Sequence, residues 1–410
     1  MKITIISDSH LGFGWGTERQ DDPFDAFSDA LKKAAGSDAA IFPGDMFDSK
    51  TPSTDVLART MEIMAKTKLR PNSVRVSGLK KNMENFPELS FYGLPVAAIH
   101  GTHERRVRGL LNPMEALEKA GFLFYIHGNG IILEKGNEKV CIQGFGGVPD
   151  QFAETVMKEF DFRPAEGCFN IFVLHQSLSG FVKAPLTVPL ESLPPGFDLY
   201  ICGHVHEPKK SHTPSGRPLL IAGSTIQTQL TKESGKKRGI WHLETGTGAL
   251  EFEELENQRP VYYMEFKSPD IHEITERMDS VISGNHGKKP VVRIKVDKLP
   301  RGLRKELESA YGEKVMLSFK SDWAPAEFSP AGLEERKLSV QELGMKFLRK
   351  NMKDAGLEPR KFESVFELLE NRNTDAALDL LMGGNKKEIY VSENGNHKGD
   401  SEADSQDSQA

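Results

Sequence analysis

The sequence has few cysteines and no long uninterrupted apolar run. Only three cysteines occur among 410 residues, and they lie far apart in apolar segments, at Cys141, Cys168 and Cys202. An odd number of widely spaced thiols does not make a disulfide framework, so we expect reduced cysteines and a cytosolic protein. No apolar run reaches the ~18 residues that a membrane helix needs, and the first residues predict a strand instead of a signal peptide.

The sequence also has only a small excess of one charge sign over the other. The chain has 53 Lys and Arg against 59 Asp and Glu, a formal net charge of −6. A slightly acidic chain lacks the basic footprint of many nucleic-acid-binding proteins. However, half of this excess lies in residues 386–410, and carboxylates that hold metal ions add negative charge that bound cations reverse. The net charge therefore does not exclude a nucleic-acid partner.

Residues 1–258 alternate short apolar runs with segments of helical periodicity. The runs are rich in Ile, Val and Phe and are bounded by Gly, Pro or Asp: KITIIS, AAIFP, PVAAI, KVCIQGF, FNIFVL, DLYIC, PLLIAG and RGIWHL. Residues 23–35 and 55–66 carry apolar side chains at helical spacing. Strands that alternate with helices, and then follow one another closely, indicate an α/β core with a mixed sheet or two packed sheets.

The rest of the chain divides into three parts. Residues 259–334 predict a smaller α+β domain, with strands at VYYMEF, VVRIKV and KVMLSF and a helix over 271–282. Residues 335–384 are helical in pattern, and we expect the apolar stripes within 338–383 to dock on a partner. Residues 385–410, rich in Ser, Asp, Gln and Asn, predict a disordered tail.

Five polar clusters lie at or just beyond the ends of the apolar runs. They are DSH, PGDMFD, HGTHE, LHQS and CGHVH. In α/β sheets, ligands bind outside the carboxyl ends of strands, where loops from several strands meet. Imidazole and carboxylate together suit Mn²⁺, Zn²⁺ or Fe²⁺ better than Mg²⁺. Residues two apart on an extended segment point to the same side, so Asp8 with His10, and His204 with His206, can each grip a metal ion.

Each cluster has an ordinary structural explanation when it is taken alone. Asp8 could cap a helix, Gly-Asp is a common turn, and the His-x-His pair could be a solvated hairpin. The order of all five clusters along one chain favours metal binding. We interpret Asp48 and Glu104 as carboxylates that support metal ligands, with Glu104 orienting a ligand histidine. His100 is interpreted as a strand-end histidine with a hydrogen-bond partner.

At these clusters the sequence resembles a known family. The order DxH, GDxxD, GNH, H and GHxH is similar to the signature of calcineurin-like metallophosphoesterases. The segments DSHLG, DPFDAF and GDMFD, the long gap to HGTHERR and the helical C-terminal part look like the archaeal SbcD-like "meiotic recombination eleven" nucleases of double-strand-break repair. The resemblance implies a two-sheet α/β sandwich core, a smaller α+β capping domain and C-terminal helices.

The resemblance also assigns roles to individual residues. It implies two Mn²⁺ ions held by seven residues, with Asp8, His10 and His206 on the first ion, Thr102, His175 and His204 on the second, and Asp45 on both. Thr102 stands where the family has Asn, and a hydroxyl is the poorer neutral ligand. His103 would face the substrate phosphate and protonate the leaving oxygen.

Basic clusters have both a functional and an ordinary interpretation. Arg105 and Arg106 follow the catalytic turn, where they would contact phosphate or form a solvated face. The run from Lys236 to Arg238 lies in an expected loop and is interpreted as solvated.

The family's activity is a 3′-to-5′ exonuclease on duplex DNA and an endonuclease on single strands. The resemblance further implies a homodimer without membrane attachment, in the cytoplasm at the nucleoid, whose residues 338–383 bind an SbcC-like ABC ATPase. Two alternatives remain open. One is a metallophosphoesterase with another substrate, such as a cyclic nucleotide or a phosphoprotein. The other is a DNA-end tether with weak nuclease activity, which Thr102 in place of Asn permits.

Overall fold

The computed structural model describes residues 1–79, 82–106, 109–256, 258–267, 271–284, 286–296 and 302–321. These lie in one compact unit, Met1–Trp323. The expected helical region 335–384 and the tail 385–410 lie outside the described residues and stay predictions.

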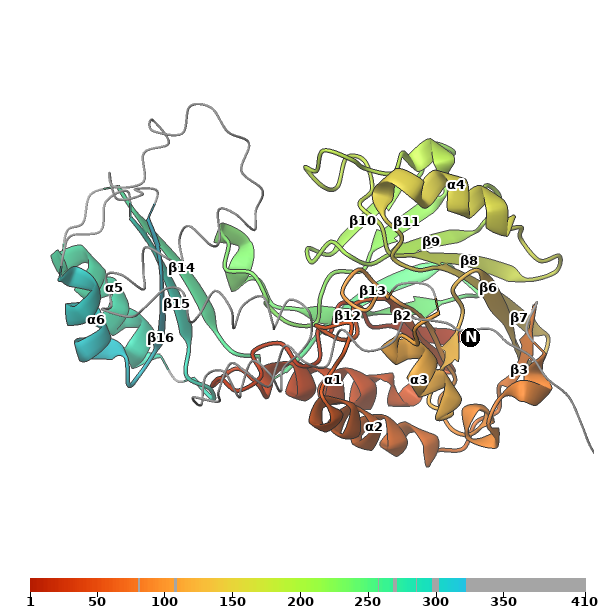
Figure 1. Ribbon diagram of the computed structural model, residues 1–410, viewed down its shortest axis with the longest axis horizontal. Coiled ribbons are helices and arrows are strands. Elements are labelled where there is room, and N and C mark those ends of the chain that lie inside the picture. The colour runs from red at the N-terminus through yellow and green to blue at the C-terminus, as the bar shows by residue number, and fades with distance from the viewer. Residues whose placement is uncertain are drawn as a thin grey trace, which may run out of the picture. The chain divides into compact units, whose positions relative to one another are not determined.

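The first sheet has six strands in the order β13-β12-β1-β2-β4-β5 (Figure 1). Their bounds are β1 Lys2–Ile5, β2 Ala39–Pro43, β4 Val96–Ile99, β5 Phe124–Tyr125, β12 Gly239–Glu244 and β13 Ala249–Glu254. The neighbours β1, β2, β4 and β5 run parallel, whereas β12 pairs antiparallel with both β1 and β13. The sheet is therefore mixed, and its parallel strands direct their carboxyl ends to one edge.

The second sheet has seven strands in the order β10-β11-β9-β8-β7-β6-β3. Their bounds are β3 Arg75–Gly78, β6 Asn129–Lys135, β7 Glu138–Phe145, β8 Phe169–Leu174, β9 Leu199–Cys202, β10 Lys209–His212 and β11 Pro218–Ile221. The central strands β7, β8, β9 and β11 are parallel, and antiparallel strands flank them. All eight strands expected in residues 1–258 are present.

The two sheets pack face to face, and helices cover their outer faces (Figure 1). The helices are α1 Asp22–Lys33, α2 Thr54–Lys68 and α3 Pro113–Lys119 on the first sheet, and α4 Asp150–Phe160 on the second. Strand β2 shows how one sequence serves two layers: Ala40 and Phe42 pack with the helices, and Ile41 packs between the sheets. This alternation follows from the two-residue period of a strand. The predicted two-sheet α/β sandwich is confirmed.

Local signals explain where the helices begin. Helix α2 is capped by Ser53, whose side chain accepts a hydrogen bond from the amide of Val56. Helix α3 starts with a capping box between Asn112 and Glu115, each accepting from the other's backbone amide. Short 3-10 helices complete this part: η1 Ala34–Gly36, η2 Met83–Asn85, η3 Glu88–Phe91, η4 Leu190–Ser192 and η5 Lys232–Gly235.

A third, three-stranded parallel sheet follows, in the order β14-β15-β16. Its elements are β14 Val261–Phe266, α5 Ile271–Ser283, β15 Val291–Val296, α6 Leu303–Tyr311 and β16 Met316–Ser321. Its helices and strands share a separate hydrophobic core. The three strands and helix α5 were expected, whereas α6 was not, although Leu303, Leu307 and Tyr311 form a buried stripe at four-residue spacing. The boundary at 258/259 stays a prediction.

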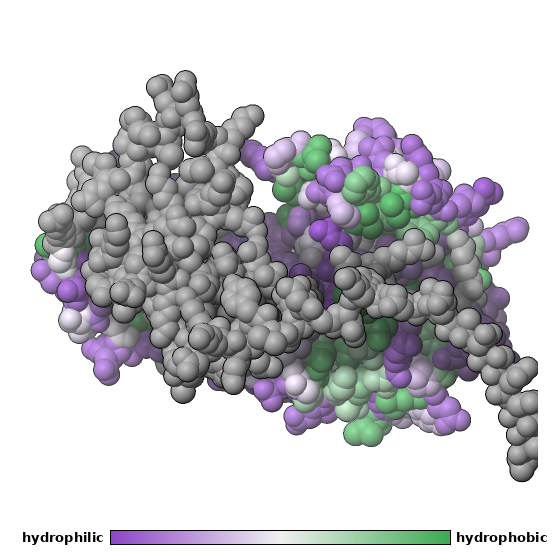
Figure 2. All heavy atoms as spheres, in the orientation of Figure 1, coloured by the Kyte–Doolittle hydropathy of each residue, from purple (hydrophilic) through white to green (hydrophobic). Residues whose placement is uncertain are grey.

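Hydrophilic side chains cover most of the coloured surface in Figure 2, with smaller hydrophobic patches between them. Within the described residues, no helix is long and apolar enough to cross a membrane. All three cysteines are free; Cys141 and Cys202 are buried, and Cys168 is partly exposed.

Candidate metal centre

The predicted site residues lie directly after five parallel strands, three from the first sheet and two from the second. They are Asp8 and His10 after β1, Asp45 after β2, Thr102 and His103 after β4, His175 after β8, and His204 and His206 after β9. The two sheets therefore deliver their carboxyl ends to one place, as the sequence predicted.

The backbone at this place adopts an unusual conformation. Five non-glycine residues among those described have a positive φ, and four of them are predicted ligands: Asp8 at 49°, His10 at 45°, Asp45 at 46° and His204 at 75°. Left-handed backbone is costly for residues with a Cβ and persists where the surrounding structure enforces it. Strained residues of this kind gather at functional sites, so their concentration here supports the prediction of a site at this edge of the sandwich.

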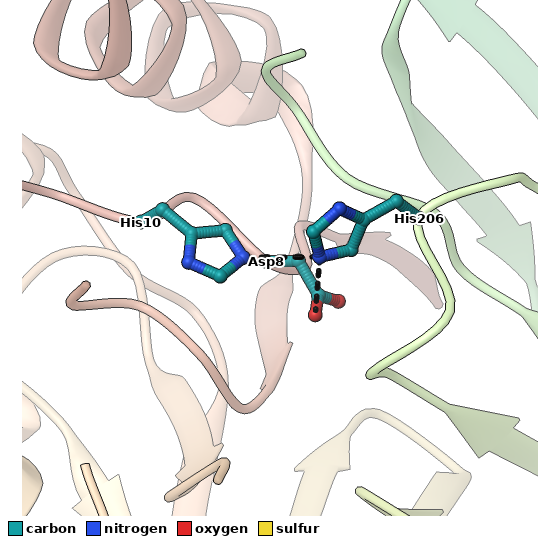
Figure 3. A group of neighbouring side chains, drawn as sticks. All are labelled: Asp8, His10 and His206. Carbon is teal, nitrogen blue, oxygen red and sulfur yellow. Dashed lines mark hydrogen bonds and ion pairs between the residues drawn. The ribbon is translucent and has the colours of Figure 1, made fainter. Parts of the chain in front are cut away.

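We call Asp8, His10 and His206 the first ligand group. One potential ligand atom from each lies within 4.8 Å of the others, and Figure 3 shows the two rings and the carboxylate turned toward one another. The Nε2 atoms of His10 and His206 are 3.1 Å apart, and His206 Nε2 is 3.8 Å from Asp8 Oδ1. Two imidazole nitrogens that face each other need a proton or a cation between them, so the geometry suits a metal ion.

We call Asp45, His175 and His204 the second ligand group, whose potential ligand atoms also lie within 4.8 Å of one another. The ring of His175 is fully buried, and its Nδ1 lies 2.7 Å from the carbonyl oxygen of Pro43. Because Nδ1 donates to that carbonyl, Nε2 carries a lone pair in the neutral ring. This Nε2 has no hydrogen-bond partner of good geometry among the described residues and lies 3.1 Å from Asp45 Oδ2. A buried lone pair beside a carboxylate fits a metal ligand.

The pKa values of the buried side chains show that this site favours a positive charge beside its two carboxylates. Burial lowers the pKa of His175, but the charges of Asp45 and Asp8 outweigh burial and raise that pKa to about 10. Burial raises the pKa of Asp8 to about 6, and it lowers the pKa of His204 to about 4 and that of His206 to about 3. Without metal, the buried carboxylates thus hold a proton on His175, which a divalent cation would displace.

The carboxylate of Asp45 contacts the turn that follows β4. Its Oδ1 accepts a hydrogen bond of 2.9 Å from the backbone amide of His103, and the hydroxyl of Thr102 lies 3.4 Å from its Oδ2. A Cβ at Gly101 would overlap the Asp45 carboxylate, so only glycine permits this approach. That Thr102 ligates metal stays a prediction.

Glu104 supports the site in a different way from the one expected. Its buried carboxylate accepts hydrogen bonds from the backbone amides of Asp45 at 3.1 Å, Phe47 at 2.8 Å and Gly101 at 2.6 Å. Burial, together with the charge of Asp45, raises its pKa to about 7. The expectation that Glu104 orients a ligand histidine is wrong: it fixes the backbone of the two turns that carry Asp45 and His103.

His103 lies at the open side of the site, with 43% of its side chain exposed. Its Nδ1 is 3.0 Å from the carbonyl oxygen of Asp48, and its ring centre is 4.8 Å from that of His10. The carboxylate of Asp48 lies 3.1 Å from His10 Nδ1, which agrees with the supporting role expected for it. Arg105 is exposed and Arg106 half-buried, and their contact with phosphate stays a prediction.

His100 behaves as expected, because it is buried and its Nδ1 lies 2.6 Å from the hydroxyl of Tyr125. Residues that the sequence did not single out complete the surroundings. Ser177 Oγ lies 3.2 Å from His204 Nε2, and Thr228 Oγ1 lies 3.1 Å from His206 Nδ1. The position of Ser177 two residues after His175 was a usable signal, whereas nothing in the sequence marks Thr228.

The comparisons with known proteins agree with this geometry. The family model "Calcineurin-like phosphoesterase" matches residues 1–208, about half of the chain and all but the last part of the sandwich. The chain belongs to the calcineurin-like phosphoesterase family.

Within that family, the chain is similar to double-strand break repair proteins of the Mre11 group. It is 24% identical to mre-11 of Caenorhabditis elegans over 93% of this chain and 60% of that protein. It is 28% identical to human MRE11 over 58% of this chain and 38% of that protein. It is 25% identical to Mre11 of Methanopyrus kandleri over 65% of this chain and 59% of that protein. The chain therefore spans between about two fifths and three fifths of the length of these relatives.

Proposed function

We propose that this chain is a metal-dependent phosphodiesterase that cuts DNA at double-strand breaks. The observation that carries the proposal is the meeting of two ligand groups from the ends of four strands, β1, β2, β8 and β9, around the buried carboxylates of Asp8 and Asp45. The names of the relatives, all double-strand break repair proteins, support the choice of DNA as the substrate.

The donor set fits two divalent cations such as Mn²⁺, because each group combines imidazole with carboxylate. The first ligand group would hold one ion and the second ligand group the other, with Asp45 shared and Thr102 as a neutral donor. When bound, such ions neutralise the charge of a phosphodiester and activate the attacking water.

His103 would act on the leaving group. Because its Nδ1 donates to the carbonyl of Asp48, the opposite nitrogen, Nε2, is the one left for substrate. A protonated Nε2 can hydrogen-bond the phosphate and give its proton to the departing sugar oxygen. Arg105, exposed two residues later, could contact a neighbouring phosphate of the same strand.

The finer proposals concern polarity and partners. We propose 3′-to-5′ exonuclease activity on duplex DNA and endonuclease activity on single strands. Residues 259–334 would cap the DNA, and residues 338–383 would bind an SbcC-like ABC ATPase. The protein would work as a homodimer that brings two DNA ends together.

The test uses the full chain with Mn²⁺ or with a chelator on three substrates: a linear duplex with labelled ends, circular single-stranded DNA, and bis(p-nitrophenyl) phosphate. We expect Mn²⁺-dependent cleavage of both DNAs, and 3′-end label released first from the duplex. Hydrolysis of the small diester without DNA cleavage would reject DNA as the substrate while keeping the phosphoesterase. Failure to hydrolyse any of the three in Mn²⁺ would reject the enzyme itself.

A further inference from the structure

Arg238 stands out from the basic run to which it belongs. The side chains of Lys236 and Lys237 are 64% and 69% exposed, whereas that of Arg238 is 3% exposed. The expectation that the whole run is solvated is therefore wrong for Arg238. A buried guanidinium needs acceptors for its donors, and those acceptors show what it does.

The guanidinium of Arg238 reaches the loop that carries two predicted metal ligands. It donates from Nη1 to the carbonyl oxygen of His206, and from Nη2 to Glu207 Oε1 at 3.1 Å. It also donates from Nε to Gln227 Oε1 at 2.8 Å. The planar fork of arginine thus joins His206, its neighbour Glu207 and the segment of Gln227, which a lysine could not do with one nitrogen.

The main chain of Arg238 is itself fixed. Its amide donates to Gln258 Oε1 at 2.8 Å, and its carbonyl accepts from the amide of Leu255 at 2.9 Å and from Gln258 Nε2 at 2.6 Å. Arg238 precedes β12, which pairs with β13 on one side and β1 on the other in the first sheet. The guanidinium therefore extends from a rigid element to the metal-ligand loop.

The imidazole of His206 is held from the other side as well. Its Nδ1 lies 3.1 Å from Thr228 Oγ1, one residue after Gln227. With Nδ1 so occupied, Nε2 faces the ligand atoms of Asp8 and His10. Arg238 thus fixes the backbone of His206, and Thr228 fixes its ring.

We propose that Arg238 is a positioning residue for the first ligand group: it holds the loop of His206 so that Nε2 stays aimed at the metal ion. This inference rests on the proposed function, because it requires that an ion binds there. A cation buried near a metal ion is electrostatically unfavourable, and Glu207 at the guanidinium offsets part of that cost. Supporting contacts of this kind change metal affinity by about 10- to 100-fold in other sites.

The test compares Arg238→Met, which keeps length but removes every donor, with Arg238→Lys and with the matched control Lys237→Met. Mn²⁺ binding to the full chain is measured by calorimetry and by electron paramagnetic resonance, which reports whether the ions are coupled. We expect Arg238→Met to lower the affinity for one of two Mn²⁺ ions about tenfold or more, with the affinity for the other ion unchanged. The resonance signal of coupled ions should decrease as well. Arg238→Lys should recover part of that affinity, and Lys237→Met should match the wild type.

Wild-type affinity for both ions in Arg238→Met would overturn the positioning role. So would an equal loss of both ions together with a lowered melting temperature, since that pattern indicates a merely structural residue. If Arg238→Met does not fold, Arg238→Ala with added guanidinium provides the second measurement. Guanidinium should restore the affinity for the Mn²⁺ ion that the substitution weakens. Failure to restore that affinity overturns the proposal. A wild-type protein that binds no Mn²⁺ would instead reject the proposed function.

Discussion

The two ligand groups differ in what orients their histidines. In the second ligand group, the buried ring of His175 is held by a backbone carbonyl, that of Pro43 at the end of β2. In the first ligand group, the rings of His10 and His206 are held by side chains, those of Asp48 and Thr228. The ring of His204, also in the second ligand group, has a side-chain partner, Ser177, so the contrast lies between His175 and the other three histidines.

The second ligand group therefore contains one histidine fixed by the main chain, whereas every histidine of the first ligand group is fixed by a side chain. A main-chain contact at a strand end survives almost any substitution that leaves the strand in place. A side-chain contact depends on one residue type and can be removed singly. The first ligand group should therefore be the more sensitive of the two to substitutions outside the ligands.

The largest effect is expected from Asp45→Asn, because the proposed function assigns Asp45 to both ions and the change removes a charge while keeping the shape. We expect activity in Mn²⁺ to fall on the order of 10³-fold and the affinity for both ions to weaken. Asp161→Asn is the matched control, since Asp161 has a similar positive φ of 49° but is exposed and belongs to neither ligand group. Retention of more than about a tenth of the activity would show that the two groups do not share this carboxylate.

His103→Ala should lower the rate of catalysis without changing the affinity for metal ions. The exposed ring lies beside the predicted ligands and has its Nδ1 on a backbone carbonyl, so its removal would take away the proposed proton donor and leave both ligand groups in place. We expect the rate to fall about 10²-fold or more, with both ions still bound, as measured by turnover and by Mn²⁺ titration. His212→Ala, an exposed histidine on β10, should change neither quantity. Loss of an ion in His103→Ala would instead make His103 a ligand, together with His10 and Asp48.

The sequence predicted the fold and the meeting of the predicted site residues because both depend on local patterns. Strands such as KITI and FNIFVL are apolar runs with clear ends, and the Asp and His residues follow them directly. The contacts that orient these ligands could not be predicted in the same way. The carbonyl of Pro43 and the amides that bind Glu104 belong to the backbone, which carries no residue signature.

Arg238 shows a second reason for failure. In sequence it ends a run of three basic residues, a pattern typical of a solvated loop. Its burial depends on the carbonyl of His206, 32 residues earlier, and on Gln227, and these meet only when β12 joins the first sheet. Helix α6 was missed for a simpler reason: its nine residues make too few turns for the helical repeat of apolar residues to stand out in the sequence.

Asp48→Ala sharpens the comparison between the groups. The carboxylate holds His10 Nδ1 at 3.1 Å, so its loss should free the ring of a ligand in the first group alone. We expect about tenfold weaker binding of one Mn²⁺ ion and an unchanged second ion in a calorimetric titration. Asp55→Ala, at an exposed position in the first turn of α2, controls for loss of a nearby charge. Equal weakening of both ions would show that the two groups are not separable.

The smallest effect is expected from Thr102→Asn, which acts on the second ligand group and in the opposite direction. The hydroxyl of Thr102 lies 3.4 Å from Asp45 Oδ2, so the side chain at this position already points at the Asp45 carboxylate. An amide oxygen is a better neutral donor than a hydroxyl, and we expect one ion to bind more tightly by roughly 1 kcal/mol, about fivefold. Thr102→Val, of the same shape without the hydroxyl, should weaken the same ion. If neither variant changes the affinity of either ion in a Mn²⁺ titration, position 102 contributes no ligand, and the second ion must rely on Asp45, His175 and His204 alone.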